Sequence, residues 1–172
     1  MEKISKTKLK EIIDDVLLKC DSYDRFAGFL ELDWNYDLKG DMFWYALKET
    51  YSTCDNLYGF KDNIKQAFSS EEPSREKLMS KKEQKYLSTL PENLTIYRGM
   101  TVQEFESGDF GVSWTLRKDV AEFFAYKYCR NQATAHLPKM VHELPIKKSD
   151  IIAYFGERKE FEVIYMQPIH KK

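Results

Sequence analysis

The type and spacing of the apolar residues change at Pro91, and this change constrains the fold more than any other feature. Before it, apolar residues such as Ile12 and Val16 recur at helical spacing. After it, short runs rich in β-branched and aromatic residues alternate with turn residues, which is typical of strands. The sequence therefore predicts an α+β protein with a helical region over 1–90 and a mainly β region over 91–172. We expect the two regions to form one compact domain, because 172 residues suit one domain better than two.

Several local signals mark where individual elements begin. Asp41 is a candidate cap for one helix, and Pro73, with Glu76 three residues later, marks the start of another. Thr101 and Glu104 form a Thr-x-x-Glu pattern that is typical of a helix start. After Pro91, strands are expected over 94–100, 111–116, 139–146, 150–155 and 160–166, and helices within 101–111 and over 117–130.

The charge balance excludes binding through a global electrostatic field. The formal net charge is only −1, so no overall positive potential attracts nucleic acid or anionic membrane, although local patches remain possible. The basic stretch over 73–85, which includes Glu76 and Glu83, is most often a solvated helix face. Aromatic residues make up 15% of the chain and supply enough ring surface to line a ligand pocket as well as a core.

The cysteine and histidine spacings predict that the chain binds no metal. Cys20, Cys54 and Cys129 are widely spaced and odd in number, which fits reduced thiols better than a disulfide framework. No CxxC, HxxxH or HExxH pattern is present. The first twenty residues carry charges throughout their apolar positions, unlike a signal peptide or a membrane span. These observations predict a cytoplasmic protein that does not enter the membrane.

Two carboxylates, Glu160 and Glu162, lie one residue apart in the last expected strand. Because side chains alternate across a strand, both are expected on one face, with Phe161 and Val163 on the other. On strand pattern alone, a solvated strand end explains this pair best. The alternative is that the two carboxylates face a ligand.

Two further polar patterns precede this strand. Arg98 ends a short apolar run and is followed by Gly99, which lets a backbone or a ligand approach closely. The planar fork of an arginine suits a diphosphate. Ser113 and Thr115 share one face of another expected strand, where two hydroxyls can hold a buried carboxylate. Taken singly, each pattern is better explained without a ligand: Arg98 by an arginine that extends to solvent from a strand end, and Ser113 with Thr115 by polar residues on a half-exposed strand.

The order of these three patterns resembles the Arg-Ser-Glu class of mono-ADP-ribosyltransferases, which includes clostridial toxins and phage enzymes. An aromatic-Arg-Gly strand end, a Ser-x-Thr strand followed by a helix, and a final Glu-x-Glu-Val strand occur in the family's order over about residues 93–167. The resemblance implies a helical N-terminal lobe packed on a split mixed β-sheet core of the ADP-ribosyltransferase type. It also implies an enzyme that uses NAD as co-substrate and needs no metal.

The resemblance assigns a role to each polar residue. Arg98 would bind the phosphates and ribose of NAD, and Ser113, with Thr115, would hold the catalytic carboxylate of Glu162. A fixed carboxylate stabilises the positive charge that develops on the ribose when the nicotinamide bond breaks. Glu160 would polarise the incoming nucleophile or accept its proton. The middle pattern departs from the commonest Ser-Thr-Ser form, since Trp114 and Thr115 replace its last two residues.

Further residues are implied at the two substrates. Tyr97, Gly99 and Phe123 would lie at the cofactor, with Tyr97 and Phe123 as candidates for stacking on nicotinamide. The segment 154–159 corresponds to the family's acceptor-recognition loop, so Tyr154 and Phe155 would contact the acceptor. The loop is short in this chain.

The leading functional hypothesis is mono-ADP-ribosylation of a macromolecular acceptor. A glutamate at position 160 favours a protein arginine as that acceptor. The same chemistry on a nucleobase of RNA or DNA, NAD hydrolysis without an acceptor, and a catalytically silent binding or inhibitory module are the alternatives. An enzyme that consumes NAD inside a cell suggests a toxin–antitoxin or phage-defence setting with an antitoxin or other neutralising partner, by analogy with the family alone.

Overall fold

The computed structural model describes residues 5–55, 57–128, 135–156 and 159–167. The chain divides into two compact units, Met1–Leu78 and Met79–Lys172. The boundary therefore lies before the expected one at residue 90, and the last helix of the expected helical region belongs to the unit that contains the sheet. The class is α+β, as the sequence predicts. In the described parts of the chain, no helix is both long enough and apolar enough to cross a membrane.

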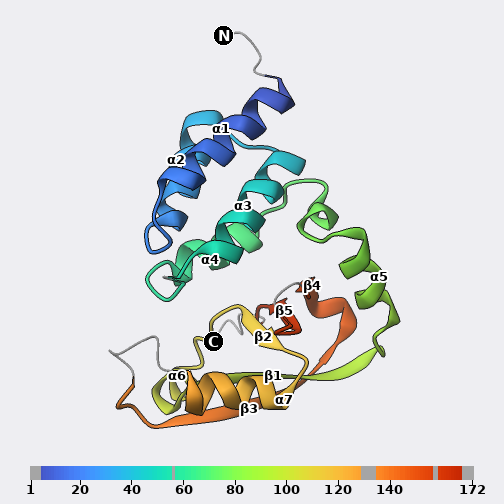
Figure 1. Cartoon of the computed structure of the whole chain (residues 1–172). Coiled ribbons are helices and arrows are strands. Elements are labelled where there is room, and N and C mark those ends of the chain that lie inside the picture. The colour runs from blue at the N-terminus through green and yellow to red at the C-terminus, as the bar shows by residue number, and fades with distance from the viewer. Residues whose placement is uncertain (1–4, 56, 129–134, 157–158, 168–172) are drawn as a thin grey trace. The chain divides into compact units, whose positions relative to one another are not determined.

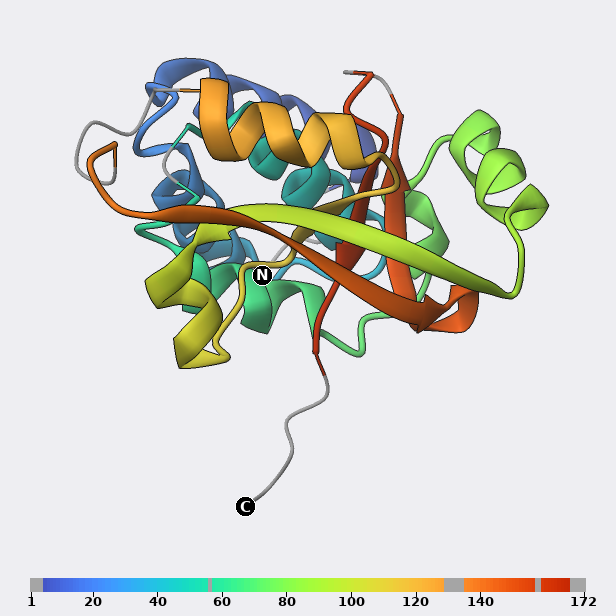
Figure 2. The ribbon, with the colours of Figure 1, turned by 90° about the horizontal axis from the view of Figure 1, so that it is seen from below.

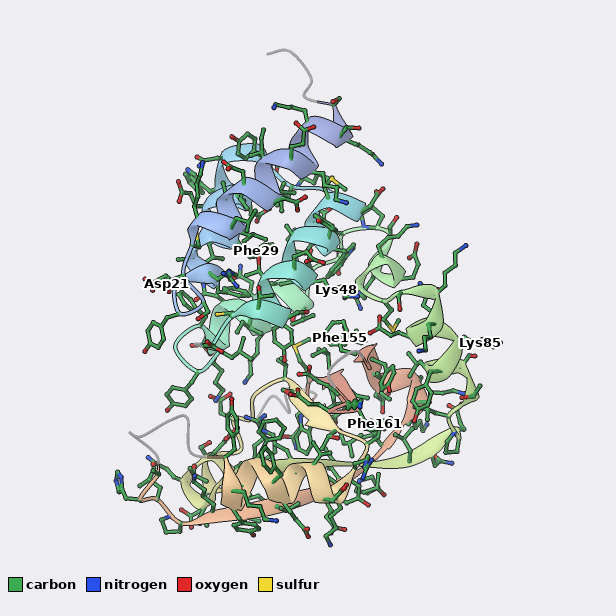
Figure 3. The ribbon with its side chains drawn as sticks, in the orientation of Figure 1. Asp21, Phe29, Lys48, Lys85, Phe155 and Phe161 are labelled. Carbon is green, nitrogen blue, oxygen red and sulfur yellow. The ribbon has the colours of Figure 1, made fainter. Side chains whose placement is uncertain are left out.

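The first unit is helical (Figure 1). Its helices pack around aromatic side chains: Phe29 is 1% exposed, and its ring lies 5.3 Å from that of Phe26 and 5.6 Å from that of Phe43 (Figure 3). Asp41 is not the cap but the first residue of its helix, after Gly40. The elements are α1 (Lys6–Lys19), α2 (Arg25–Tyr36), α3 (Asp41–Thr53), α4 (Lys61–Phe68) and the 3₁₀ turn η1 (Arg75–Leu78).

The predicted start of a helix near Pro73 is wrong. The chain forms only the short η1 there, and the regular helix α5 (Lys81–Thr89) begins later. Ser80 caps α5, because its hydroxyl accepts from the backbone N–H of Glu83 while the Glu83 carboxylate accepts from the backbone N–H of Ser80. This reciprocal capping box fixes the start of α5.

The second unit holds a five-stranded sheet with the order β3-β1-β2-β5-β4. All of its described pairings are antiparallel, so the expectation of a mixed sheet is corrected. The elements that follow α5 are β1 (Asn93–Thr101), α6 (Val102–Ser107), β2 (Ser113–Thr115), α7 (Lys118–Glu122), the π-helical segment η2 (Phe123–Lys127), β3 (Lys139–Lys147), the 3₁₀ turn η4 (Lys148–Asp150), β4 (Ile151–Phe155) and β5 (Glu162–Tyr165).

The sheet consists of a long part and a short part. β1 and β3 pair over their whole lengths and run side by side (Figure 2). The short part contains β2, β5 and β4, and it meets β1 where Tyr97 pairs with Thr115. One face of this sheet carries a core cluster, formed by side chains of alternate strand residues together with Phe110, which precedes β2. This core cluster comprises Ile96, Met100, Phe110, Trp114, Ile146, Ile151, Tyr154, Val163 and Tyr165.

The helix expected over 117–130 is regular only in its first part. α7 continues into η2, where the Tyr128 N–H donates to the carbonyl of Phe123, five residues earlier. This helical segment packs along β1 (Figure 2). At the contact, a Cβ on Gly99 would meet the carbonyl oxygen of Ala121 at 2.4 Å and the backbone nitrogen of Ala125 at 2.7 Å. Gly99 therefore serves the close approach of a helix backbone to the strand.

Candidate active site

The site is centred on the carboxylate of Glu162, the first residue of β5. Glu162 pairs with Thr115 of β2, and the Ser113 hydroxyl on the same strand donates to the Glu162 carboxylate at 2.5 Å. Both residues are half-buried. The donor is neutral, so this hydrogen bond orients the carboxylate without cancelling its negative charge. Ser113 and Glu162, which the sequence patterns only suggested as partners, lie in direct contact.

Thr115 has a different role from that of Ser113. Its hydroxyl donates to the backbone carbonyl of Glu160 at 2.6 Å and accepts from the backbone N–H of Arg117 at 3.1 Å. Thr115 therefore ties the chain just before β5 to the chain just after β2. Its side chain is buried, which strengthens both bonds relative to water.

The backbone around Glu160 departs from a regular strand. Lys159 and Phe161 have positive φ angles of 58° and 50°, in the left-handed region that non-glycine residues rarely adopt. The expected alternation of Glu160 and Glu162 along one strand is therefore wrong, because β5 begins only at Glu162. Left-handed non-glycine residues cost roughly 1–2 kcal/mol each and cluster at functional sites. In the described part of the chain, the Glu160 carboxylate has no hydrogen-bonding or ionic partner.

Arg98 is joined to the site through Ser113. Its guanidinium donates to the Ser113 carbonyl at 2.7 Å and to one carboxylate oxygen of Glu104 at 3.0 and 2.8 Å. The same Glu104 oxygen accepts from the Gly111 N–H at 3.0 Å. The Arg98 and Glu104 side chains are each 20% exposed, so the arginine charge is balanced within the protein. Each terminal nitrogen of Arg98 keeps one N–H that no described residue accepts.

The register places Arg98 and Tyr97 on opposite faces of β1. Tyr97 pairs with Thr115, which pairs with Glu162, so these three side chains start from one face of the sheet. Arg98 starts from the other face, opposite His142 of β3. The half-buried Tyr97 is therefore one of the aromatic residues that the sheet brings into the row of Glu162.

Two other predicted cofactor residues lie where β1 meets α7 and η2. Gly99 is covered by the backbone of α7 and η2, which leaves no room there for a ligand. Phe123 is 46% exposed at the start of η2, where its ring lies 5.6 Å from that of Phe124 and 5.9 Å from that of Tyr128.

Both aromatic residues predicted at the acceptor are buried. Tyr154 is 5% exposed, and its ring stacks on that of Tyr86 of α5 at 4.5 Å. Burial, with smaller effects from Tyr86 and Glu83, raises the pKa of the Tyr154 phenol, which keeps it neutral. Phe155 is 8% exposed and pairs with Glu162 across the sheet. Neither ring is therefore exposed to solvent, where the sequence-based prediction places it at an acceptor.

One polar residue near the site was misread from the sequence. Glu83, expected on a solvated helix face, is only 4% exposed, and its carboxylate accepts from the Gly156 N–H at 3.0 Å. The signal that points to it is the Ser-x-x-Glu capping pattern of Ser80 and Glu83. The charged residues over 73–85 suggest one solvated helix, whereas the regular helix begins only at Lys81, after the Ser80 cap.

The arrangement suits stabilisation of a positive charge. It combines a carboxylate that is oriented by a neutral hydroxyl, a second carboxylate on a strained turn, and an arginine whose position is fixed by two partners. Such an oriented carboxylate stabilises an oxocarbenium-like ribose electrostatically, and the second can accept a proton from a nucleophile. In the described residues, no group of three or more His, Cys, Asp or Glu side chains could hold a metal ion.

Comparison of the chain with protein-family models, with curated proteins and with solved structures found no match.

Proposed function

We propose that the chain is a mono-ADP-ribosyltransferase that uses NAD. The observation that carries the proposal is the hydrogen bond from Ser113 to the Glu162 carboxylate, made between neighbouring strands in the chain order expected of an Arg-Ser-Glu enzyme. The Ser113 hydroxyl gives this carboxylate a fixed orientation and, being neutral, removes none of its charge. Electrostatic stabilisation of a developing cation requires both properties.

The reaction breaks the bond between nicotinamide and the anomeric carbon of ribose. The bonding electron pair leaves with the nicotinamide nitrogen, and the ribose becomes oxocarbenium-like, as in glycoside hydrolysis. Glu162 stabilises this cation and binds the ribose hydroxyl next to it. The nucleophile then forms a bond to the anomeric carbon and loses a proton, which Glu160 accepts.

Arg98 supports this chemistry as a fixed donor. Its two remaining terminal N–H groups can bind a diphosphate oxygen, while Glu104 and the Ser113 carbonyl hold the guanidinium in place. Because Glu104 offsets its charge, Arg98 contributes less Coulomb attraction than a free arginine would. We therefore assign it to orientation of NAD more than to tight binding.

The acceptor we propose is a protein arginine. The Glu160 carboxylate, which has no partner among the described residues, can bind a guanidinium and accept the proton that the guanidinium loses as its nitrogen bonds to the anomeric carbon. No observation on the described residues specifically favours a nucleobase.

The test uses the full chain, NAD labelled in the adenosine part, and separate protein, RNA and DNA acceptors. We expect Glu162→Gln to reduce both nicotinamide release and transfer by about 10²- to 10³-fold, because it keeps the shape and removes the charge. Ser113→Ala should reduce both by a smaller factor, since the carboxylate remains but loses its orienting donor. Glu106→Gln, an exposed carboxylate of α6, makes the same chemical change away from the site and should have no effect.

The possible outcomes separate the parts of the proposal. Wild-type protein that releases no nicotinamide, or a Glu162→Gln variant with unchanged turnover and a native circular-dichroism spectrum, would rule out the chemistry. Label on RNA or DNA alone would leave the chemistry standing and reject arginine as the acceptor.

A further inference from the structure

Glu83 is the one charged side chain that is buried among the described residues. It lies in the first turn of α5, where its Oε2 accepts from the Ser80 N–H and hydroxyl, each at 2.8 Å. A buried carboxylate is costly unless its oxygens accept hydrogen bonds. The capping box uses one oxygen and leaves the other for a second partner.

The second partner is the backbone of Gly156, directly after β4. The Gly156 N–H donates to Glu83 Oε1 at 3.0 Å, across 73 positions of sequence. The neighbouring contacts bring the same two segments together: the Tyr86 ring stacks on Tyr154, and the Tyr154 N–H lies 3.2 Å from the sulfur of Met79. α5 therefore holds the end of β4 at several points, of which Glu83 is the charged one.

Gly156 is in turn bonded to the backbone that carries Glu160. The Lys159 N–H donates to the Gly156 carbonyl at 3.3 Å, and Glu160 follows between the two left-handed residues. On its other side, the Glu160 carbonyl accepts from Thr115. The backbone at Lys159 and Glu160 thus has two anchors, Glu83 through Gly156 on one side and Thr115 on the other.

We propose that Glu83 is a positioning residue for Glu160 and so for the acceptor step. This inference rests on the proposed function. Glu162 has a separate orienting hydrogen bond, from Ser113 on β2. Loss of the Glu83 carboxylate releases the Gly156 anchor and lets the strained backbone at Lys159 and Phe161 relax. Glu160 then leaves its position, whereas the NAD-cleaving carboxylate remains.

The proposal predicts a change in partition between transfer and hydrolysis. A displacement of about 1 Å at a reacting group can lower a rate by about 10²-fold. We expect Glu83→Ala to lower the ratio of transfer to NAD hydrolysis about 10- to 100-fold, while total nicotinamide release changes less than about threefold. Glu83→Gln should lower the ratio by about three- to tenfold, because its single amide oxygen cannot accept from both Ser80 and Gly156.

The control is Leu87→Ala on the same helix. Leu87 packs against the core cluster, whereas the Gly156 N–H is bonded to Glu83, so loss of the Leu87 side chain weakens α5 without removing the anchor. Its transfer-to-hydrolysis ratio should equal that of the wild type. Transfer and hydrolysis are measured together as protein-bound label and free ADP-ribose, at a temperature where circular dichroism shows every variant to be folded.

Each outcome decides a different point. Wild-type protein without nicotinamide release would reject the proposed function and the inference with it. With an active wild type, an unchanged ratio in Glu83→Gln would reject the inference alone, and this holds even when Glu83→Ala does not fold. An equal loss in Leu87→Ala would show that α5 acts only through general stability, which also rejects it.

Discussion

At the scale of single residues, Glu162 and Arg98 are oriented by different kinds of partner. The neutral Ser113 hydroxyl orients Glu162, whereas the Glu104 carboxylate offsets the charge of Arg98 directly. A carboxylate that stabilises a developing cation must keep its charge. An arginine that only orients a diphosphate can be neutralised and still donate hydrogen bonds. The difference in partners therefore matches a difference in role.

The Arg98–Glu104 pair predicts that loss of the Arg98 side chain lowers the stability of the fold. Arg98→Ala leaves the mostly buried Glu104 carboxylate without its cation and removes the donor to the Ser113 carbonyl. We expect the free energy of unfolding to fall by about 2–3 kcal/mol, below the full value for a buried pair because both side chains retain some exposure. Urea unfolding monitored by circular dichroism measures this change.

Arg117→Ala is the matched control for Arg98→Ala. Arg117 also pairs with a carboxylate, that of Asp119, but both side chains are at least half exposed. Its loss should change the free energy of unfolding by no more than about 1 kcal/mol, as for exposed pairs in general. Equal changes in the free energy of unfolding for the two substitutions would show that the Arg98–Glu104 pair contributes no more to stability than an exposed ion pair.

The residues of the site were predictable from sequence to unequal degrees. Ser113 and Glu162 meet because strand alternation and antiparallel pairing place them there, and both follow from period-two patterns. The conformation at Glu160 does not follow, because the positive φ angle of Phe161 has no sequence signal of the kind that glycine or asparagine gives. Glu104 was read as half of a capping box, but its carboxylate binds Arg98 and Gly111 instead.

At the scale of elements, the contact between β1 and the α7–η2 helix depends on Gly99. A methyl group at this position would overlap backbone atoms of Ala121 and Ala125, which cannot rotate away as a side chain can. We expect Gly99→Ala to reduce the free energy of unfolding by about 3 kcal/mol, in the range for an overpacked core. The measurement is again the urea midpoint and slope.

Gly108→Ala provides the comparison for Gly99→Ala. Gly108 ends α6 with a φ angle of 65°, and a Cβ there would meet nothing within 4 Å. Only the left-handed conformation opposes this change, which should cost about 1 kcal/mol. If Gly99→Ala lowers the free energy of unfolding no more than Gly108→Ala does, the backbone of α7 and η2 does not approach β1 as closely as the distances indicate.

The π-helical turn next to this contact was not predictable, because an apolar stripe at helical spacing does not distinguish i→i+4 from i→i+5 bonding.

At the scale of the whole molecule, α5 shows where sequence patterns stop being informative. Helical spacing identifies α5 as a helix but does not say which core it covers. The contacts assign it to the sheet unit: Met79 and Leu87 pack against the core cluster, and Glu83 binds Gly156. The boundary between the units consequently lies between Leu78 and Met79. The α+β class was predictable because the change at Pro91 is a change of residue type, whereas the boundary depends on long-range contacts.

The placement of α5 predicts how fragments of the chain behave. A fragment of residues 79–172 keeps the core cluster, the capping box and the Glu83–Gly156 bond, so we expect it to fold alone with a cooperative urea transition. A fragment of residues 91–172 leaves the Gly156 N–H without its acceptor and exposes the core that Met79 and Leu87 cover. Its free energy of unfolding should be lower by at least about 3 kcal/mol. Equal stability of the two fragments would contradict the assignment of α5 to the sheet unit, and with it the structural basis for Glu83 as the anchor of Glu160.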